Sequence, residues 1–182
     1  RISGDIVALN NIISGQPETL YYYGIENTVS KINYPLTGSI AVHHVYPLDA
    51  LIILGLYDNV VGMTNSGFIN TVGKDPYRYP GIGTEILNIG TPEEDSEKLL
   101  DTGAKVYIQP FSMDNTKIKK VISDEGSDLQ IVGLPMSTFY PGKVNQYGSL
   151  LMLGVMFNKT DRAEEYIAFI DKIEKDINDK VS

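Results

Sequence analysis

The chain has 182 residues, which suits one domain or one domain with a small extension. Its net charge of −8 and the lack of a basic patch argue against a nucleic-acid partner, and the absence of cysteine excludes disulfides and thiolate metal sites. No apolar run approaches the roughly 18 residues that a membrane-spanning helix needs.

Residues 1–38 contain short apolar runs separated by glycine and proline. Residues 20–23 form one such run, and residues 28–32 alternate between polar and apolar, as an exposed strand does. We expect small strands or straps that precede the main sheet.

The stretch 38–67 predicts a strand, a helix and a second strand. Residues 39–42 and 60–63 are apolar strands, and residues 48–56 form a helix with Pro47 at its start. Two parallel strands joined by a helix belong to a sheet that binds ligands beyond the carboxyl ends of its strands. Residues 43–46 and 64–68 are therefore the expected binding positions.

The next stretch, 68–90, lacks strong periodicity and predicts a loop region, with or without a helical turn. Gly81 and Gly83 do not make a dinucleotide fingerprint, because Ile86 stands where the third glycine belongs. Thr91 and the proline after it then predict a helix over 91–102.

The chain continues in the same alternation of strands and helices. We expect strands at 106–108 and 129–134, a helix capped by Asp114 or Asn115, and a helix at 144–157. The alternation predicts an α/β fold: a Rossmann-like parallel sheet over residues 39–158 with helices on both faces.

Residues 159–182 predict one long terminal helix. Apolar residues recur there at spacings of three and four, and the helix would be about 30 Å long. The partner of its apolar stripe is not evident from this chain.

These segments resemble the class III solute-binding proteins of ABC importers. The runs LGL at 54–56 and DNVVG at 58–62 are similar to the family's opening, and YRYPGIGT at 77–84 resembles the stretch ahead of its helix. SEKLLDTGAKVYI at 96–108 and LGVMFNKTDRAEEYIAFID at 153–171 resemble two later family segments. In the first of these, Gly103 and Ala104 depart from the family's Leu-Lys-Pro pattern.

The resemblance implies two α/β lobes bridged by a rigid helix, with the ligand held between them. It identifies this chain as an N-terminal lobe, residues 39–158, followed by the interlobe helix, residues 159–182, with the second lobe absent. The family's usual ligands are ferric siderophores, haem and cobalamin, and sometimes metal or oxyanions. The implied protein is no enzyme and has no resident cofactor or metal, although its ligand contains iron or cobalt.

The resemblance also implies a cellular location and protein partners. The partners would be the transmembrane subunits of an ABC permease, and the isolated lobe would self-associate through the stripe of its terminal helix. Residue 1 is Arg rather than Met, so we expect any signal or lipid anchor to precede the chain shown. The protein would work outside the cytoplasm, in the periplasm or on the outer cell surface, anchored to the membrane in its full-length form.

The candidate ligand-binding residues all follow predicted strands. They are His43, His44, Tyr46, Asn65, Ser66, Phe68, Ser137, Phe139 and Tyr140. The adjacent histidines face opposite ways on a strand, so either one is buried and one solvated, or one contacts a ligand or metal. The aromatic residues either pack in the protein or offer broad contact to a large flat ligand.

Glu97 falls at the family's glutamate that docks onto permease arginines, and the alternative is an ordinary solvated carboxylate. A second function also stays open, that of a stand-alone α/β enzyme or sensor domain with the same topology. No nucleophile elbow and no P-loop occur in the sequence.

Overall fold

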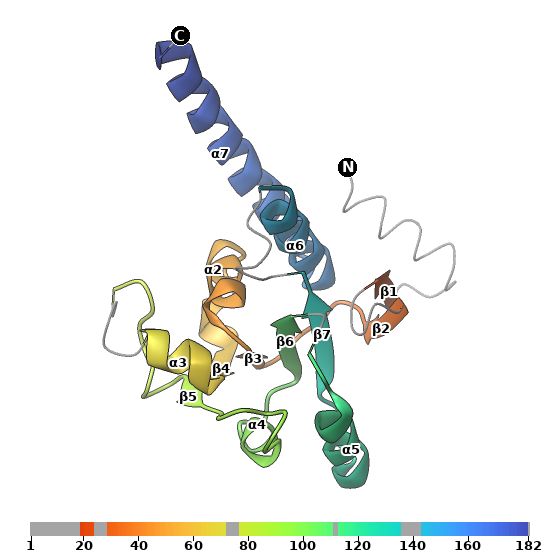
Figure 1. Cartoon of the computed structure of the whole chain (residues 1–182). Coiled ribbons are helices and arrows are strands. Elements are labelled where there is room, and N and C mark those ends of the chain that lie inside the picture. The colour runs from red at the N-terminus through yellow and green to blue at the C-terminus, as the bar shows by residue number, and fades with distance from the viewer. Residues whose placement is uncertain (1–18, 24–28, 72–76, 111–112, 136–142, 182) are drawn as a thin grey trace.

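The computed structural model describes residues 19–23, 29–71, 77–110, 113–135 and 143–181. In chain order its elements are β1 (Thr19–Tyr23), β2 (Val29–Asn33), β3 (Ile40–Val42), α2 (Val45–Ile53), η2 (Tyr57–Asn59), β4 (Val60–Met63), α3 (Asn65–Thr71), β5 (Leu87–Asn88), α4 (Glu97–Asp101), β6 (Val106–Pro110), α5 (Thr116–Glu125), β7 (Gln130–Leu134), α6 (Lys143–Met156) and α7 (Thr160–Val181) (Figure 1).

Five parallel strands form the central sheet in the order β5-β4-β3-β6-β7. From β3 the chain moves outward through β4 to β5, then returns to the other side of β3 and moves outward through β6 to β7. This doubly wound arrangement confirms the predicted α/β fold with a Rossmann-like parallel sheet.

Helices cover both faces of the sheet, and alternate strand residues feed two separate cores. Ile40 and Val42 of β3 face α2 and α6, where Leu51 and Leu153 are fully buried. Ala41 faces the opposite side, where the core contains Leu99 of α4, Tyr107 of β6 and Ile118 of α5. A sheet buried on both faces requires the nearly continuous apolar strands seen in the sequence.

An antiparallel hairpin made by β1 and β2 lies against the β7 edge of the sheet. The backbone N–H of Gly133 donates to the Tyr22 hydroxyl at 3.0 Å, and the N–H of Asn33 donates to Gln130 Oε1 at 2.6 Å. The hairpin supplies partners for polar groups at the edge of β7. β1 and β2 agree with the strands expected at 20–23 and 28–32.

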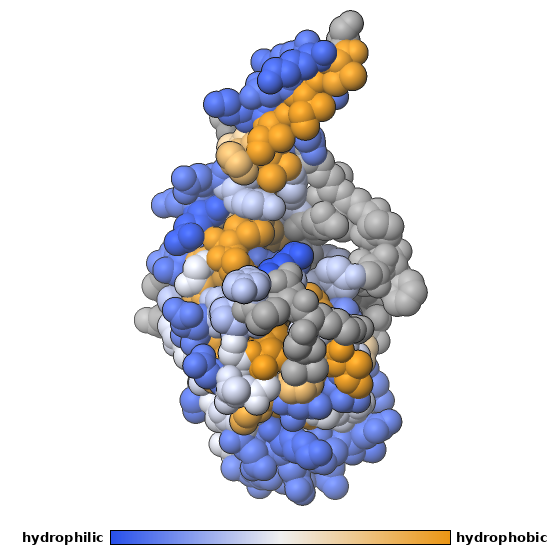
Figure 2. Space-filling view, turned by 90° about the vertical axis from the view of Figure 1, so that its left-hand side faces the viewer, coloured by the Kyte–Doolittle hydropathy of each residue, from blue (hydrophilic) through white to orange (hydrophobic). Residues whose placement is uncertain are grey.

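Helix α7 leaves the body of the molecule as a rod (Figure 1). The first turns of α7 pack on α6, and Ala163 of α7 is fully buried there. The two helices are so close that a Cβ added to Gly154 of α6 would lie 3.0 Å from the Cβ of Ala163. Farther along, Ile177 and Val181 are 55% and 79% exposed and belong to an apolar stripe that Figure 2 shows on the rod. None of the described helices is both long and apolar enough to cross a membrane.

Two predicted helix starts are wrong. Helix α2 begins at Val45, before Pro47, and the proline is tolerated because the first four N–H groups of a helix have no partner within it. Helix α4 covers only Glu97–Asp101 of the predicted 91–102. Residues 91–95 form turns instead, with the N–H groups of Glu94 and Asp95 donating to the Thr91 carbonyl.

Helix α3 starts before the stretch expected to be a loop with or without a helical turn and runs into it, so the start of this helix was not predicted. The two-residue strand β5, which adds an edge to the sheet, was not predicted either. Both are short, so neither leaves a clear periodic pattern in the sequence.

Candidate functional site

The strand order creates a switch point between β3 and β6. These two strands are neighbours, but their connections leave toward opposite edges of the sheet. Connecting segments therefore diverge just beyond Val42 and Pro110, and ligands of open α/β sheets bind in the crevice formed there. The predicted residues 43–46 follow one of these two strands.

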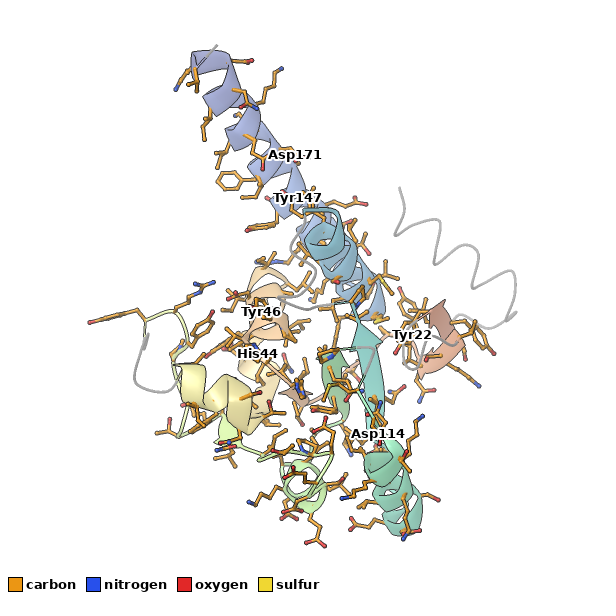
Figure 3. All side chains as sticks on the ribbon, viewed as in Figure 1. Tyr22, His44, Tyr46, Asp114, Tyr147 and Asp171 are labelled. Atoms are coloured by element: carbon orange, nitrogen blue, oxygen red, sulfur yellow. The ribbon has the colours of Figure 1, made fainter. Side chains whose placement is uncertain are left out.

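His44 and Tyr46 form a ring platform beside the first turn of α2 (Figure 3). Their rings stack with centroids 5.2 Å apart and planes 12° apart, and Tyr46 is 37% exposed. His44 Nδ1 is buried and has no hydrogen-bond partner within the described ranges, and burial lowers the pKa of this histidine. The platform thus combines a flat stacking surface with one unused polar atom.

The first turn of α3 supplies a second part of this edge. Thr64 donates a short hydrogen bond from Oγ1 to the His43 carbonyl, and its Oγ1 lies 3.1 Å from Ser66 Oγ. Asn65 is exposed and accepts a hydrogen bond from Asn88 at 3.1 Å. The hydrogen bond from Thr64 to His43 therefore connects the segment after β4 to the segment after β3.

Gly67 allows this close approach. A Cβ at this position would lie 3.2 Å from His44 Cα, a backbone atom that cannot rotate away. The next residue, Phe68, is half-buried, and its N–H donates to the Thr64 carbonyl. We refer to His44, Tyr46, Asn65, Ser66 and Phe68 together as the rim.

His43 points away from the rim. Its ring is 17% exposed, and Nδ1 lies 3.0 Å from the Tyr107 hydroxyl and 3.7 Å from Glu93 Oε1. Burial, with a smaller contribution from His44, lowers the pKa of His43 to about 4. A neutral imidazole at neutral pH cannot act as a counter-ion for the Glu93 carboxylate, so this contact is no salt bridge there.

Glu93 is a buried acid that sequence reasoning assigned to a helix start. Both carboxylate oxygens are buried and lack hydrogen-bond partners among the described residues. Burial raises the pKa of Glu93, and the charges of Glu94 and Asp114 raise it further. The backbone N–H of Glu93 partly counteracts this rise in the pKa, although it does not form a hydrogen bond with either carboxylate oxygen.

Gln109 and Asn115 are also buried polar residues that were not predicted as site residues. Both are 0% exposed, and each has side-chain atoms without a partner in the described part of the chain. A signal for Gln109 was present in the sequence, because Tyr107 and Gln109 are polar residues two apart in an otherwise apolar strand and so share one face.

The remaining predicted residues divide into two groups. Ser137, Phe139 and Tyr140 lie outside the described residues. Glu97 is the first residue of α4 and is exposed, and its N–H donates to Asp95 Oδ1 at 3.2 Å. The described residues contain no group of three or more His, Asp or Glu side chains arranged to hold a metal ion.

No protein-family model matches the chain, and no curated protein sequence does either. Solved structures do match it. A periplasmic binding protein from Veillonella parvula has 16% identity and a TM-score of 0.60, with 90% of this chain covering 54% of that one. The petrobactin-binding protein YclQ from Bacillus subtilis has 18% identity and a TM-score of 0.60, with coverages of 88% and 52%.

A third match is PiuA, the substrate-binding protein of an iron uptake ABC transporter from Streptococcus pneumoniae. It has 18% identity and a TM-score of 0.56, with 88% of this chain covering 53% of that one. The chain therefore spans about half the length of the solved structures that it matches. Its fold is that of half of a periplasmic solute-binding protein, in agreement with the resemblance found in the sequence.

Proposed function

We propose that this chain is the N-terminal lobe and interlobe helix of a solute-binding component of an ABC importer for an iron complex. One observation carries the proposal: the rim lies at the carboxyl edge of a lobe whose fold matches half of such proteins. The protein would capture its ligand and deliver it to a membrane permease, without chemistry of its own.

The rim favours a ligand with flat or aromatic parts. The stacked rings of His44 and Tyr46 offer broad contact at a small cost in side-chain entropy, and half-buried Phe68 follows Gly67, which lies against His44. Asn65 and Ser66 add polar groups. We propose a ferric siderophore or haem, or a related chelate such as cobalamin, as the ligand class.

The stripe on α7 supports the expectation of a second lobe. Phe169, Ile173, Ile177 and Val181 are all at least 39% exposed, which is unusual for four large apolar residues on one helix. We propose that the second lobe covers the stripe in the whole protein and that the isolated chain covers it by self-association.

With this function the protein would work outside the cytoplasm, anchored to the membrane in its full-length form. The permease would then approach from the membrane side, and exposed Glu97 at the start of α4 is our proposed docking contact. An exposed charge at the edge of such an interface would steer the encounter more than it would tighten the complex.

The test uses the full reading frame. Haem, a corrinoid and ferric siderophores are titrated while tyrosine fluorescence and thermal stability are followed. We expect one of them to bind, and Tyr46→Ala to weaken binding by about 10-fold or more, since stacking and burial of a ring contribute more than about 1.4 kcal/mol. Tyr77→Ala is the matched control, because this tyrosine is 98% exposed.

Two results together would contradict the proposed transport function. A reading frame that lacks a second series of strands and helices, together with no binding of any of these ligands, would contradict the proposal. It would favour the alternative of a stand-alone α/β enzyme or sensor.

A further inference from the structure

A group of buried polar side chains lies near the His43 ring, which points away from the rim. The polar cluster consists of Glu93, Gln109 and Asn115. Their buried atoms without a hydrogen-bond partner, among the described residues, are Glu93 Oε1 and Oε2, Gln109 Oε1 and Nε2, and Asn115 Oδ1. Each unpaired buried polar atom costs about 1–3 kcal/mol, so a cluster of them requires an explanation.

The sheet register brings Gln109 and Glu93 to the same place. Val42 pairs with Ile108, and the N–H of His43 donates to the Ile108 carbonyl, so Gln109 is the lateral neighbour of His43. Neighbouring parallel strands lie about 4.8 Å apart. Glu93 approaches the same imidazole, with Oε1 3.7 Å from Nδ1.

Asn115 approaches from the helix that covers this face. It is the residue before α5, whose Ile118 packs in the same core as Tyr107. The Asn115 amide donates to the Met113 carbonyl, and the N–H of Met113 donates to the carbonyl of Pro110, the residue after Gln109, so Asn115 lies at the carboxyl end of β6.

The unpaired atoms of the polar cluster are mostly hydrogen-bond acceptors. Four of the five unpaired atoms are oxygens, one pair of them in a carboxyl group, and the single unpaired donor is Gln109 Nε2. The amide nitrogen of Asn115 already donates to the Met113 carbonyl at 3.0 Å. What is missing is a compact positive group.

We propose that the polar cluster of Glu93, Gln109 and Asn115, at the switch point between β3 and β6, binds a small oxygen-preferring cation, with Ca²⁺ as the probe. Carboxylate and amide oxygens are the ligands that hard cations take. Softer transition metals prefer imidazole and thiolate ligands, and the described residues offer no group of three His, Asp or Glu side chains for them. The site is independent of the ligand proposed for the rim.

The experiment measures the thermal stability of the chain in chelator-treated buffer during titration with CaCl₂, with MgCl₂ and NaCl in parallel. We expect a saturable rise in Tm with Ca²⁺, of about 5–10 °C at a concentration about 100 times Kd. Glu93→Gln keeps the shape of the side chain and removes the charge. Without added cation it should be at least as stable as the wild type, because an uncompensated buried carboxylate is gone.

Glu94→Gln is the matched control, since it makes the same change at an exposed neighbour. The proposal stands if the wild type and Glu94→Gln respond to Ca²⁺ while Glu93→Gln does not. It is overturned if none of the three cations raises the Tm of the wild type, or if Glu93→Gln responds as the wild type does. In the first case the chain has no such cation site, and in the second the cation binds somewhere other than at Glu93.

Binding can also be followed without unfolding. Tb³⁺, which resembles Ca²⁺ in size and ligand preference, emits when excited through a nearby tyrosine, and Tyr107 borders the polar cluster through His43. Emission that Ca²⁺ competes away, that Glu94→Gln keeps and that Glu93→Gln loses by about 10-fold or more would support the site. Equal emission from both variants would refute it.

Discussion

Replacing His43 should reduce the loss of stability on mild acidification. Burial lowers the pKa of this histidine from 6.5 to about 4 in the native state. Between these two pH values the unfolded chain binds a proton that the native chain does not, so stability falls as the pH falls. His43→Gln removes this contribution, because glutamine does not titrate.

The size of the effect follows from the two pKa values. The difference of about 2.5 corresponds to about 3.4 kcal/mol once the pH is below 4, and to about 1.3 kcal/mol between pH 7.5 and 5.5. The ring is only 17% exposed, so solvent screens little of this. Glu93 acts in the opposite direction, because its raised pKa makes the native state bind the extra proton as the pH falls.

The assay is urea unfolding of the wild type and His43→Gln at pH 7.5, 6.5 and 5.5, followed by far-UV circular dichroism. Comparing the two proteins cancels most of the Glu93 contribution. We expect the stability difference between them to change by about 1.3 kcal/mol in favour of His43→Gln as the pH falls. His44→Gln is the control and should change less, because His44 is only half-buried. Parallel pH profiles for the wild type and His43→Gln would refute the reasoning.

Three further predictions concern the rim, the rod and the docking surface. Gly67→Ala should destabilise the fold by about 1–3 kcal/mol, because the new Cβ would lie 3.2 Å from His44 Cα. Gly148→Ala, where a Cβ meets nothing within 4 Å, should stabilise helix α6 by about 0.5–1 kcal/mol; equal effects in urea unfolding would contradict this. Ile177→Asp should abolish self-association in light scattering without lowering Tm, since this residue is 55% exposed; a monomeric wild type at high concentration would show the idea to be wrong. Glu97→Arg should leave ligand affinity unchanged and reduce uptake by cells; loss of both would reject the docking role.

Much of the secondary structure was predictable because its causes are local. The strands at 40–42, 60–63 and 106–110 are short apolar runs, and the period of α7 is set by residues three and four apart. Gly126 ends α5 with a left-handed backbone, φ +63°, which glycine adopts readily. The position of His44, Tyr46, Asn65, Ser66 and Phe68 just beyond β3 and β4 was predictable for the same reason, whereas their role in ligand binding stays a prediction.

The start of α4 was not predictable, because the helix-start pattern of neighbouring residues competed with a contact to a distant part of the chain. Thr91 and Pro92 favour a helix over 91–102, but Glu93 instead lies beside His43, 50 residues earlier in the chain. The residues that follow then form turns, and the helix is delayed until Glu97.

By itself the sequence determined most of the strands and longer helices and that the sheet is covered on both faces, because spacing and composition depend on near neighbours. Only the tertiary structure decided that β3 lies between β4 and β6, and therefore that His43 meets Tyr107, 64 residues away. Strand order depends on which apolar faces pack together across the whole domain, and no local pattern records that choice. The polar cluster exists only because of this order, since Glu93, Gln109 and Asn115 come from three separate segments of the chain.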